Sequence, residues 1–120
     1  MAIRCMLFLI ALLVSGCAQT RYAWNGYDDL LYNYYSSPAE GERFAQGLQE
    51  TITVAERDGR LPPGIYAEYG YQLFERGRYP EAVVWFAKER EQWPESKFLM
   101  DKLIALANNR TAKGSAGGQP

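Results

Sequence analysis

Apolar residues are spaced in two different ways along this chain. Residues 6–14 (MLFLIALLV) form one continuous apolar run near the start. From residue 27 onward, apolar positions instead recur at intervals of three and four residues, the periodicity of helices that bury one face. The chain from residue 22 is therefore predicted to be all-α, a stack of about five helices.

The first expected helix begins near Tyr27. Asp28 and Asp29 follow at once, where a first helical turn favours negative charge. Apolar side chains then continue at the i, i+3, i+4, i+7, i+8 spacing: Tyr27, Leu30, Leu31, Tyr34 and Tyr35. This spacing predicts a short helix that packs one face against its neighbours.

A second helix is expected to begin at residues 37–40 (SPAE). Ser37 and Glu40 have the spacing of a capping box, and proline suits the first helical position. The apolar stripe of this helix consists of Phe44, Leu48, Ile52 and Ala55. Asp58 and Gly59 are expected to end it before a turn over residues 61–64.

Residues 63–96 carry the clearest pattern, two helices over 65–75 and 81–92 that are joined by a turn. This unit resembles one tetratricopeptide repeat, a helix–turn–helix module of 34 residues. The residues at signature positions are Tyr66, Gly70, Gly77, Tyr79, Ala82, Phe86 and Pro94. Gly70 and Ala82 are expected to let the two helices approach closely. The departures are Tyr69, Leu73 and Glu89, and Glu89 in place of a small alanine indicates looser packing.

One further helix is expected after residue 96. Its apolar residues predict a cap that closes the stack, because a single repeat cannot bury its own apolar face: Phe98, Leu99, Leu103, Ile104, Leu106 and Ala107. Residues 110–120 are small, polar and glycine-rich, so we expect a disordered tail. The helical domain is thus expected over residues 22–109.

The apolar run at the start resembles the core of a bacterial lipoprotein signal peptide over residues 1–16. Arg4 supplies the positive charge, and the run is far shorter than the roughly 20 residues that span a bilayer. It ends in LVSG and then Cys17, the pattern of a lipobox. Cys17 is the expected lipidation site, followed by a linker over residues 17–21. The alternative is an ordinary secretory signal with an incidental cysteine.

The lipobox resemblance also implies a location. Several acyl chains anchor a protein stably, whereas a single chain binds only marginally. Ala18 follows the cysteine, where aspartate would retain such lipoproteins in the inner membrane. We therefore expect the protein to be lipid-anchored to the outer membrane and to face the periplasm.

Composition and charge narrow the possible functions. Cleavage before Cys17 would leave 104 residues with 12 basic and 14 acidic side chains, and no basic cluster for nucleic acid. Histidine is absent, so no imidazole base, Ser–His pair or histidine metal site can form. No carboxylate pair has the opposed arrangement that glycosidases need. We expect a non-enzymatic protein without a cofactor or metal.

Two groups of residues are candidate sites. Tyr22, Trp24 and Tyr27 follow the linker, where amphipathic rings could lie at the membrane interface. The alternative for these aromatics is that they fill the core. The second group is a candidate partner-binding face on the first helix of the repeat: Ala67, Tyr71, Phe74 and Glu75. In tetratricopeptide proteins this face lines the groove that binds peptides. The alternative is that the upstream helices cover it.

The chain resembles a family of small bacterial lipoproteins of uncharacterised function in three features. These are the lipobox, the YAWNGY…LYNYY segment and the single repeat. That family is often associated with a curli-secretion (CsgG-like) lipoprotein, which implies membership of an envelope assembly. The first functional hypothesis is an adaptor that binds a partner envelope protein. The alternatives are an accessory lipoprotein that binds peptidoglycan or surface polysaccharide, and an acid–base hydrolase that works without histidine.

Overall fold

The computed structural model describes residues 20–116. The expected signal peptide, Cys17 and Ala18 lie outside this range. The described part is all-α, as predicted, with five α-helices, two short 3-10 turns and no strand. Their bounds are α2 Tyr27–Ser36, η1 Pro38–Glu40, α3 Gly41–Arg57, α4 Ile65–Glu75, α5 Tyr79–Gln92, η2 Pro94–Ser96 and α6 Lys97–Ala116. No helix in this range is long and apolar enough to cross a membrane.

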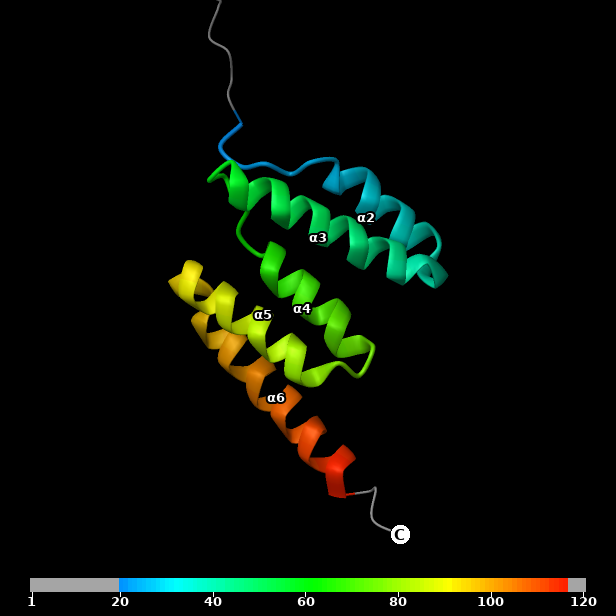
Figure 1. Cartoon of the computed structure of the whole chain (residues 1–120), viewed down its shortest axis with the longest axis vertical. Coiled ribbons are helices and arrows are strands. Elements are labelled where there is room, and N and C mark those ends of the chain that lie inside the picture. The colour runs from blue at the N-terminus through cyan, green and yellow to red at the C-terminus, as the bar shows by residue number, and fades with distance from the viewer. Residues whose placement is uncertain (1–19, 117–120) are drawn as a thin grey trace, which may run out of the picture.

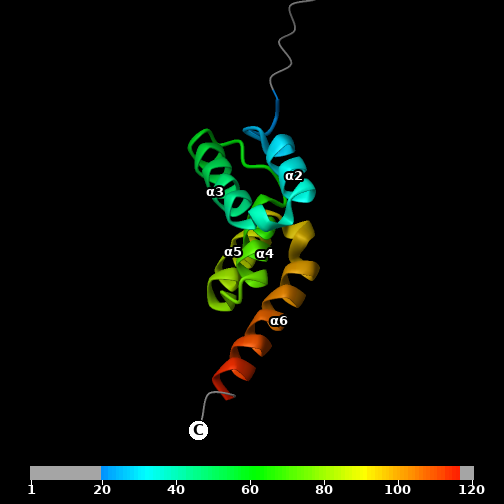
Figure 2. The same ribbon diagram turned by 90° about the vertical axis from the view of Figure 1, so that its right-hand side faces the viewer.

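The helices follow one another along the long axis of the molecule, with α2 at one end and α6 at the other (Figure 1). The most extensive packing is between α4 and α5 and between α5 and α6. In the view turned by 90°, α6 is one continuous helix that extends beyond the other helices toward the C-terminus (Figure 2). The fold is thus a helical stack in which each helix contacts mainly its neighbours in sequence.

The α4–α5 hairpin is held by a close approach of the two helices. A Cβ atom on Gly70 would lie 2.9 Å from the ring of Phe86, so only glycine fits there without a shift of its neighbours. Ala82 and Phe86 are fully buried on the facing side of α5. Gly77 has a φ of 74°, which the tight reversal between the helices requires. The expected close approach at Gly70 and Ala82 is confirmed.

The α2–α3 pair packs through the predicted apolar stripes. All four residues expected to face the core on α3 are buried: Phe44, Leu48, Ile52 and Ala55. On α2, Leu30 contacts Gly47, and the ring of Tyr34 stacks on Phe44 with centroids 4.6 Å apart. The exception on α2 is Tyr35, which is exposed.

The expected capping box at Ser37 is wrong. The Ser37 side chain makes no capping hydrogen bond, and residues 38–40 form a 3-10 turn before α3 begins at Gly41. The backbone explains the difference, because the Glu40 N–H donates to the Ser37 carbonyl oxygen at 2.9 Å. The N–H that the hydroxyl would have capped is therefore already satisfied.

The tail expected to be disordered is helical as far as Ala116, so α6 continues beyond residue 109. Arginine, alanine and lysine in this segment are good helix formers. In addition, the Thr111 hydroxyl donates to the Ala107 carbonyl at 3.1 Å, and the Ser115 hydroxyl donates to the Thr111 carbonyl at 3.1 Å. The glycine content of this segment did not predict its structure correctly. Gly114 lies within α6, in a sequence that otherwise favours a helix.

The loose packing expected at Glu89 is also wrong. Glu89 is fully buried in α5, and its Oε1 accepts a hydrogen bond from the backbone N–H of Gly64 at 2.7 Å. Gly64 is the N-cap residue of α4 and has no side chain to cap the helix itself. A side chain 25 residues further along thus supplies an acceptor at the start of α4.

Candidate functional site

The candidate partner-binding face on α4 is partly open. Tyr71 and Glu75 are exposed, whereas Ala67 and Phe74 are half-buried. The rings of Tyr71 and Phe74 stack with centroids 6.1 Å apart, and Phe74 lies edge-on to Tyr79 at 5.1 Å. Phe74 therefore packs within its own hairpin. Tyr71 is the exposed aromatic of this face.

The charge of the neighbouring Glu75 disfavours ionisation of the Tyr71 hydroxyl. The charge of Glu75 raises the pKa of Tyr71, with smaller contributions from partial burial and a hydrogen bond to the same carboxylate. Upstream, the Tyr27 hydroxyl donates to the carboxylate of Glu68, so α2 covers the side of α4 at Glu68. Tyr71 nevertheless keeps 46% of its surface exposed. The face thus presents one aromatic ring beside a carboxylate.

The three aromatic residues after the linker do not form one platform. Tyr22 is half-buried and lies edge-on to Trp93, with ring centroids 6.1 Å apart. Tyr27 is half-buried, and its burial and the hydrogen bond to Glu68 raise its pKa. Only Trp24 of the three is exposed, with its ring 5.3 Å from that of Tyr27. Their expected role at the membrane interface stays a prediction.

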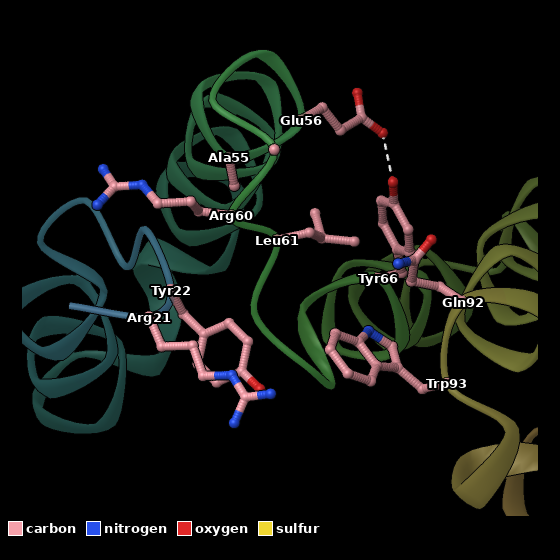
Figure 3. Close-up of a pocket in the computed structure, with 10 residues that line it drawn as sticks. Arg21, Tyr22, Ala55, Glu56, Arg60, Leu61, Tyr66, Gln92 and Trp93 are labelled. Carbon is pink, nitrogen blue, oxygen red and sulfur yellow. Dashed lines mark hydrogen bonds between the residues drawn. The ribbon is translucent and has the colours of Figure 1, made fainter. Parts of the chain in front are cut away.

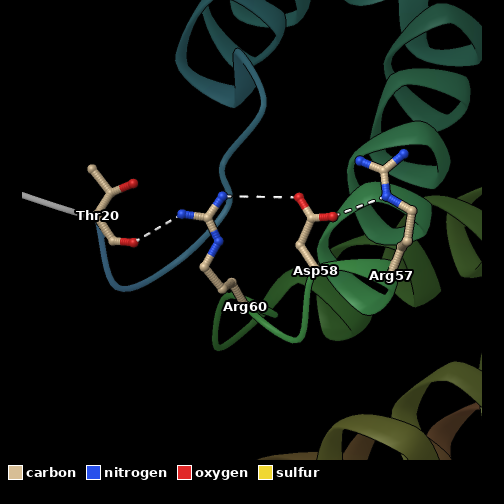
Figure 4. Close-up of polar contacts among 4 residues, drawn as sticks. All are labelled: Thr20, Arg57, Asp58 and Arg60. Carbon is tan, nitrogen blue, oxygen red and sulfur yellow. Dashed lines mark hydrogen bonds and ion pairs between the residues drawn. The ribbon is translucent and has the colours of Figure 1, made fainter.

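The segment before α2 is attached to the loop between α3 and α4. The Ala23 N–H donates to the Arg60 carbonyl at 2.8 Å, and the Arg60 guanidinium donates to the Thr20 carbonyl at 3.2 Å. The same guanidinium lies 3.9 Å from Asp58, which also pairs with Arg57 at 2.9 Å (Figure 4). These contacts hold the segment before α2 against the C-terminal end of α3.

A pocket of about 470 Å³ lies beside this junction (Figure 3). Residues from three segments line it. The first segment precedes α2, the second runs from the end of α3 through the following loop to Tyr66 on α4, and the third is the end of α5. Its aromatic side chains are Tyr22, Tyr66 and Trp93, and its charged side chains are Arg21, Arg60 and Glu56. Figure 3 shows these residues arranged around the opening, with the Tyr66 hydroxyl directed toward Glu56.

The pocket offers hydrogen-bond donors and flat rings. The Tyr66 hydroxyl donates to Glu56 at 2.5 Å, and burial together with this bond raises the pKa of Tyr66. Within residues 20–116, the buried indole N–H of Trp93 has no hydrogen-bond acceptor. The guanidinium of Arg21 lies 5.7 Å from the centre of the Tyr22 ring. Such a site can bind a polar, partly flat ligand.

The described residues contain no cluster of metal-ligand side chains. No three His, Cys, Asp or Glu side chains among residues 20–116 gather closely enough to hold a metal ion. Sequence reasoning did not anticipate the pocket, because it assigned no role to Trp93 or Arg60. No local signal marks either residue, because the pocket forms only where distant segments meet.

One comparison with known proteins gives a match. A family model described as a domain of unknown function (DUF4810) covers residues 21–103, about two thirds of the chain. The chain belongs to the DUF4810 family. Neither the search of curated proteins nor the search of solved structures finds a match. The expected membership of an uncharacterised family is confirmed to this extent.

The DUF4810 match includes both candidate sites. It begins at Arg21, at the edge of the pocket, and ends at Leu103 within α6. It therefore contains α2, the α4 face and all ten residues that line the pocket. The rest of α6, residues 104–116, lies beyond the matched region.

Proposed function

We propose that this DUF4810 protein is a non-enzymatic adaptor of the bacterial envelope that binds a partner protein through the face of α4. In this proposal Cys17 carries the lipid, and the domain is held at the outer membrane on the periplasmic side. The observation that carries the proposal is Tyr71, an exposed aromatic ring on α4 beside Glu75. Energetic anchors of protein interfaces are enriched in such aromatic residues.

The architecture supports the same proposal. The α4–α5 hairpin has the close glycine and alanine contacts expected of a tetratricopeptide-like repeat, and α4 takes the place of its first helix. In such repeats the corresponding face binds extended or helical segments of partner proteins. A rigid helix presents Tyr71 at little entropic cost, because Phe74 and Tyr79 already pack behind it.

For the partner we propose another envelope protein, a curli-secretion-like lipoprotein of the outer membrane. This choice follows the resemblance to a family of small lipoproteins that is often associated with a curli-secretion (CsgG-like) lipoprotein. A photoreactive amino acid at position 71 of the full chain tests it in intact cells. The cross-link should form with one envelope protein, and the same group at the exposed Val84 on α5 is the matched control. Equal cross-linking from both positions would contradict a specific α4 face.

The pocket favours one alternative function, binding of peptidoglycan or surface polysaccharide. Sugars pack on aromatic rings and hydrogen-bond to polar side chains, and Tyr22, Tyr66 and Trp93 stand beside Arg21 here. Trp93→Phe would replace the indole that lines the pocket with a smaller ring. If the alternative holds, this variant should bind isolated sacculi more weakly, whereas Tyr71→Ala should bind them normally. Normal binding by Trp93→Phe would remove the pocket from this hypothesis.

The lipid anchor has its own test. Cys17→Ser should abolish incorporation of labelled palmitate, because the thiol is the group that takes the lipid. A variant that still incorporates the label would overturn the assignment of Cys17. Ala18→Asp should move the protein toward the inner-membrane fraction, and an unchanged distribution would contradict the outer-membrane location.

A further inference from the structure

Large apolar side chains gather at the two ends of the helical stack. Among the described residues, six of the eight exposed large apolar side chains belong to α2, the segment just before it, or α6: Trp24, Tyr32, Tyr35, Phe98, Leu99 and Leu106. Tyr32 and Tyr35 are 72% and 74% exposed, and Phe98 and Leu99 are 74% and 56% exposed. Helical stacks normally need polar end surfaces to stay soluble. Both of these ends carry large exposed apolar side chains.

The surface at the first end is acidic. Asp28, Tyr32 and Tyr35 share the outer side of α2 through their i, i+4, i+7 spacing, and Asp29 borders them. We call these four residues the α2 end face. The helix contains no lysine or arginine, and neither aspartate forms an ion pair within residues 20–116.

The surface at the other end is basic. Met100 and Ala107 are the buried residues of α6, and its opposite side carries the α6 end face: Phe98, Leu99, Lys102, Leu106, Arg110 and Lys113. The one acidic residue of the helix, Asp101, is already bound by Lys97 and by Arg90. The three cations of the end face make no ion pair in the described part of the chain, and Lys102 lies 4.6 Å from the centre of the Phe98 ring.

The expected closing role of α6 is therefore only half fulfilled. The helix covers α5 with Met100 and Ala107, and Leu103 and Ile104 pack against the core. Its outer side, however, presents leucine and phenylalanine among its charged residues. The stack ends with an apolar surface that could be covered by a further layer.

We infer that the chain associates head to tail with a second copy of itself, the α6 end face of one copy packing on the α2 end face of the next. Each face combines exposed apolar or aromatic side chains with charges, and the charges are opposite: two aspartates on α2 and three cations on α6. Contacts between two α2 faces or two α6 faces would bring like charges together, which is costly at an interface. An anionic partner or membrane would suit α6 alone and leave α2 uncovered.

The positions of the two faces fit this arrangement. The helices α2 and α6 lie at opposite ends of the long axis, with α3, α4 and α5 between them (Figure 1). Head-to-tail contact would continue the helix-on-helix packing from one copy into the next. Such a heterologous interface forms a closed ring or an open array. The exposed Tyr71 lies on α4, between the two ends, so the inference does not depend on the proposed adaptor site.

Charge reversal tests the inference on the full chain in detergent by sedimentation equilibrium. Asp28→Lys with Asp29→Lys makes both ends basic, and Lys102→Glu with Arg110→Glu makes both ends acidic. Each double variant alone should show a dissociation constant raised at least about tenfold, because like charges now meet. An equimolar mixture of the two should associate again, since each end then finds an opposite partner.

A matched control reverses the same number of charges between the ends. Glu50→Lys with Glu91→Lys changes exposed positions on α3 and α5, and should associate like the wild type. The inference is overturned if the wild type stays monomeric at every concentration, if either end variant associates normally, or if the mixture does not associate. Circular dichroism of every variant should be unchanged, because all substituted positions are exposed.

Discussion

The Glu89 carboxylate lies where the start of α4, the end of α5 and the following turn meet. It is fully buried, and its Oε1 accepts hydrogen bonds from Gly64 N–H at 2.7 Å and from the Ser96 hydroxyl at 3.4 Å. Within residues 20–116, its Oε2 has no hydrogen-bond donor. Burial raises the pKa of Glu89, and the backbone N–H groups at the start of α4 partly oppose this shift. Glu89 therefore links three elements and is costly to ionise.

This burial predicts a specific pH dependence of stability. Because the pKa of Glu89 is higher in the folded protein than its ordinary value of 4.5, the folded state binds the proton more tightly than the unfolded chain. The contribution of Glu89 to stability should be greatest below that ordinary value and should fall as pH rises through the folded pKa. Glu89→Gln keeps an acceptor for Gly64 and cannot titrate, so it should lack this component.

Chemical denaturation of both proteins at about pH 7 and about pH 4.5 measures the effect. The difference in unfolding free energy, wild type minus Glu89→Gln, should increase in favour of the wild type at the lower pH. Other carboxylates cancel in this difference because both proteins contain them. Parallel pH dependences would mean that Glu89 titrates alike in the folded and unfolded states.

At the level of elements, the α4–α5 hairpin depends on the absence of a side chain at Gly70. A Cβ atom there would lie 2.9 Å from the buried ring of Phe86 and 3.1 Å from the Cβ of Trp85. Both neighbours belong to α5. Phe86 is fully buried, so its ring has no free space into which it could move. Side chains at position 70 should therefore push the two helices apart.

Gly70→Leu should lower the unfolding free energy by about 1–3 kcal/mol, as overpacked cores do. Leucine is a better helix former than glycine, so helix propensity cannot cause the loss. Gly114→Leu on α6 is the matched control, because a Cβ atom there meets nothing within 4 Å. This control should be at least as stable as the wild type, because leucine favours the helix and meets no obstacle there. Equal stabilities of the two variants by chemical denaturation would contradict the close approach at Gly70.

The elements could be predicted where apolar periodicity and turn residues agree. The bounds of α4 match the expectation, since Gly64 and Gly77 both have positive φ angles at the turns on either side of it. The start of α3 could not be predicted, because a backbone hydrogen bond replaced the cap that Ser37 was expected to form. The end of α6 was also missed, since Thr111 and Ser115 bond back to the helix in a segment that reads as polar and flexible.

At the level of the whole molecule, the fold class followed from sequence but the pocket did not. The residues that line the pocket come from three segments, and their meeting depends on contacts such as Ala23 N–H to the Arg60 carbonyl. The spacing of apolar residues along the chain gives no information about a long-range contact of this kind. The α4 face could be predicted as a set of neighbours, because helical spacing alone relates Ala67, Tyr71 and Phe74. Which of them is exposed depends on tertiary packing.

The two aromatic residues of the α4 face should respond differently to truncation. Phe74 is half-buried between Tyr71 and Tyr79, so Phe74→Ala should lower the unfolding free energy by about 1–3 kcal/mol. Tyr71 is 46% exposed, so Tyr71→Ala should change it by no more than about 0.5 kcal/mol. Thermal or chemical denaturation of the two single variants separates them. A large loss of stability in Tyr71→Ala would show that this ring is part of the core.

The measurement that tests the adaptor proposal most directly is the affinity of Tyr71→Ala for the envelope protein that is cross-linked from position 71. The account predicts a loss of about 2 kcal/mol, roughly thirtyfold, with folding unchanged, because one exposed aromatic anchor carries much of the interface. Val84→Ala, which truncates an exposed apolar side chain on α5, should bind as the wild type does. A folded Tyr71→Ala variant that binds this partner with wild-type affinity would contradict the account.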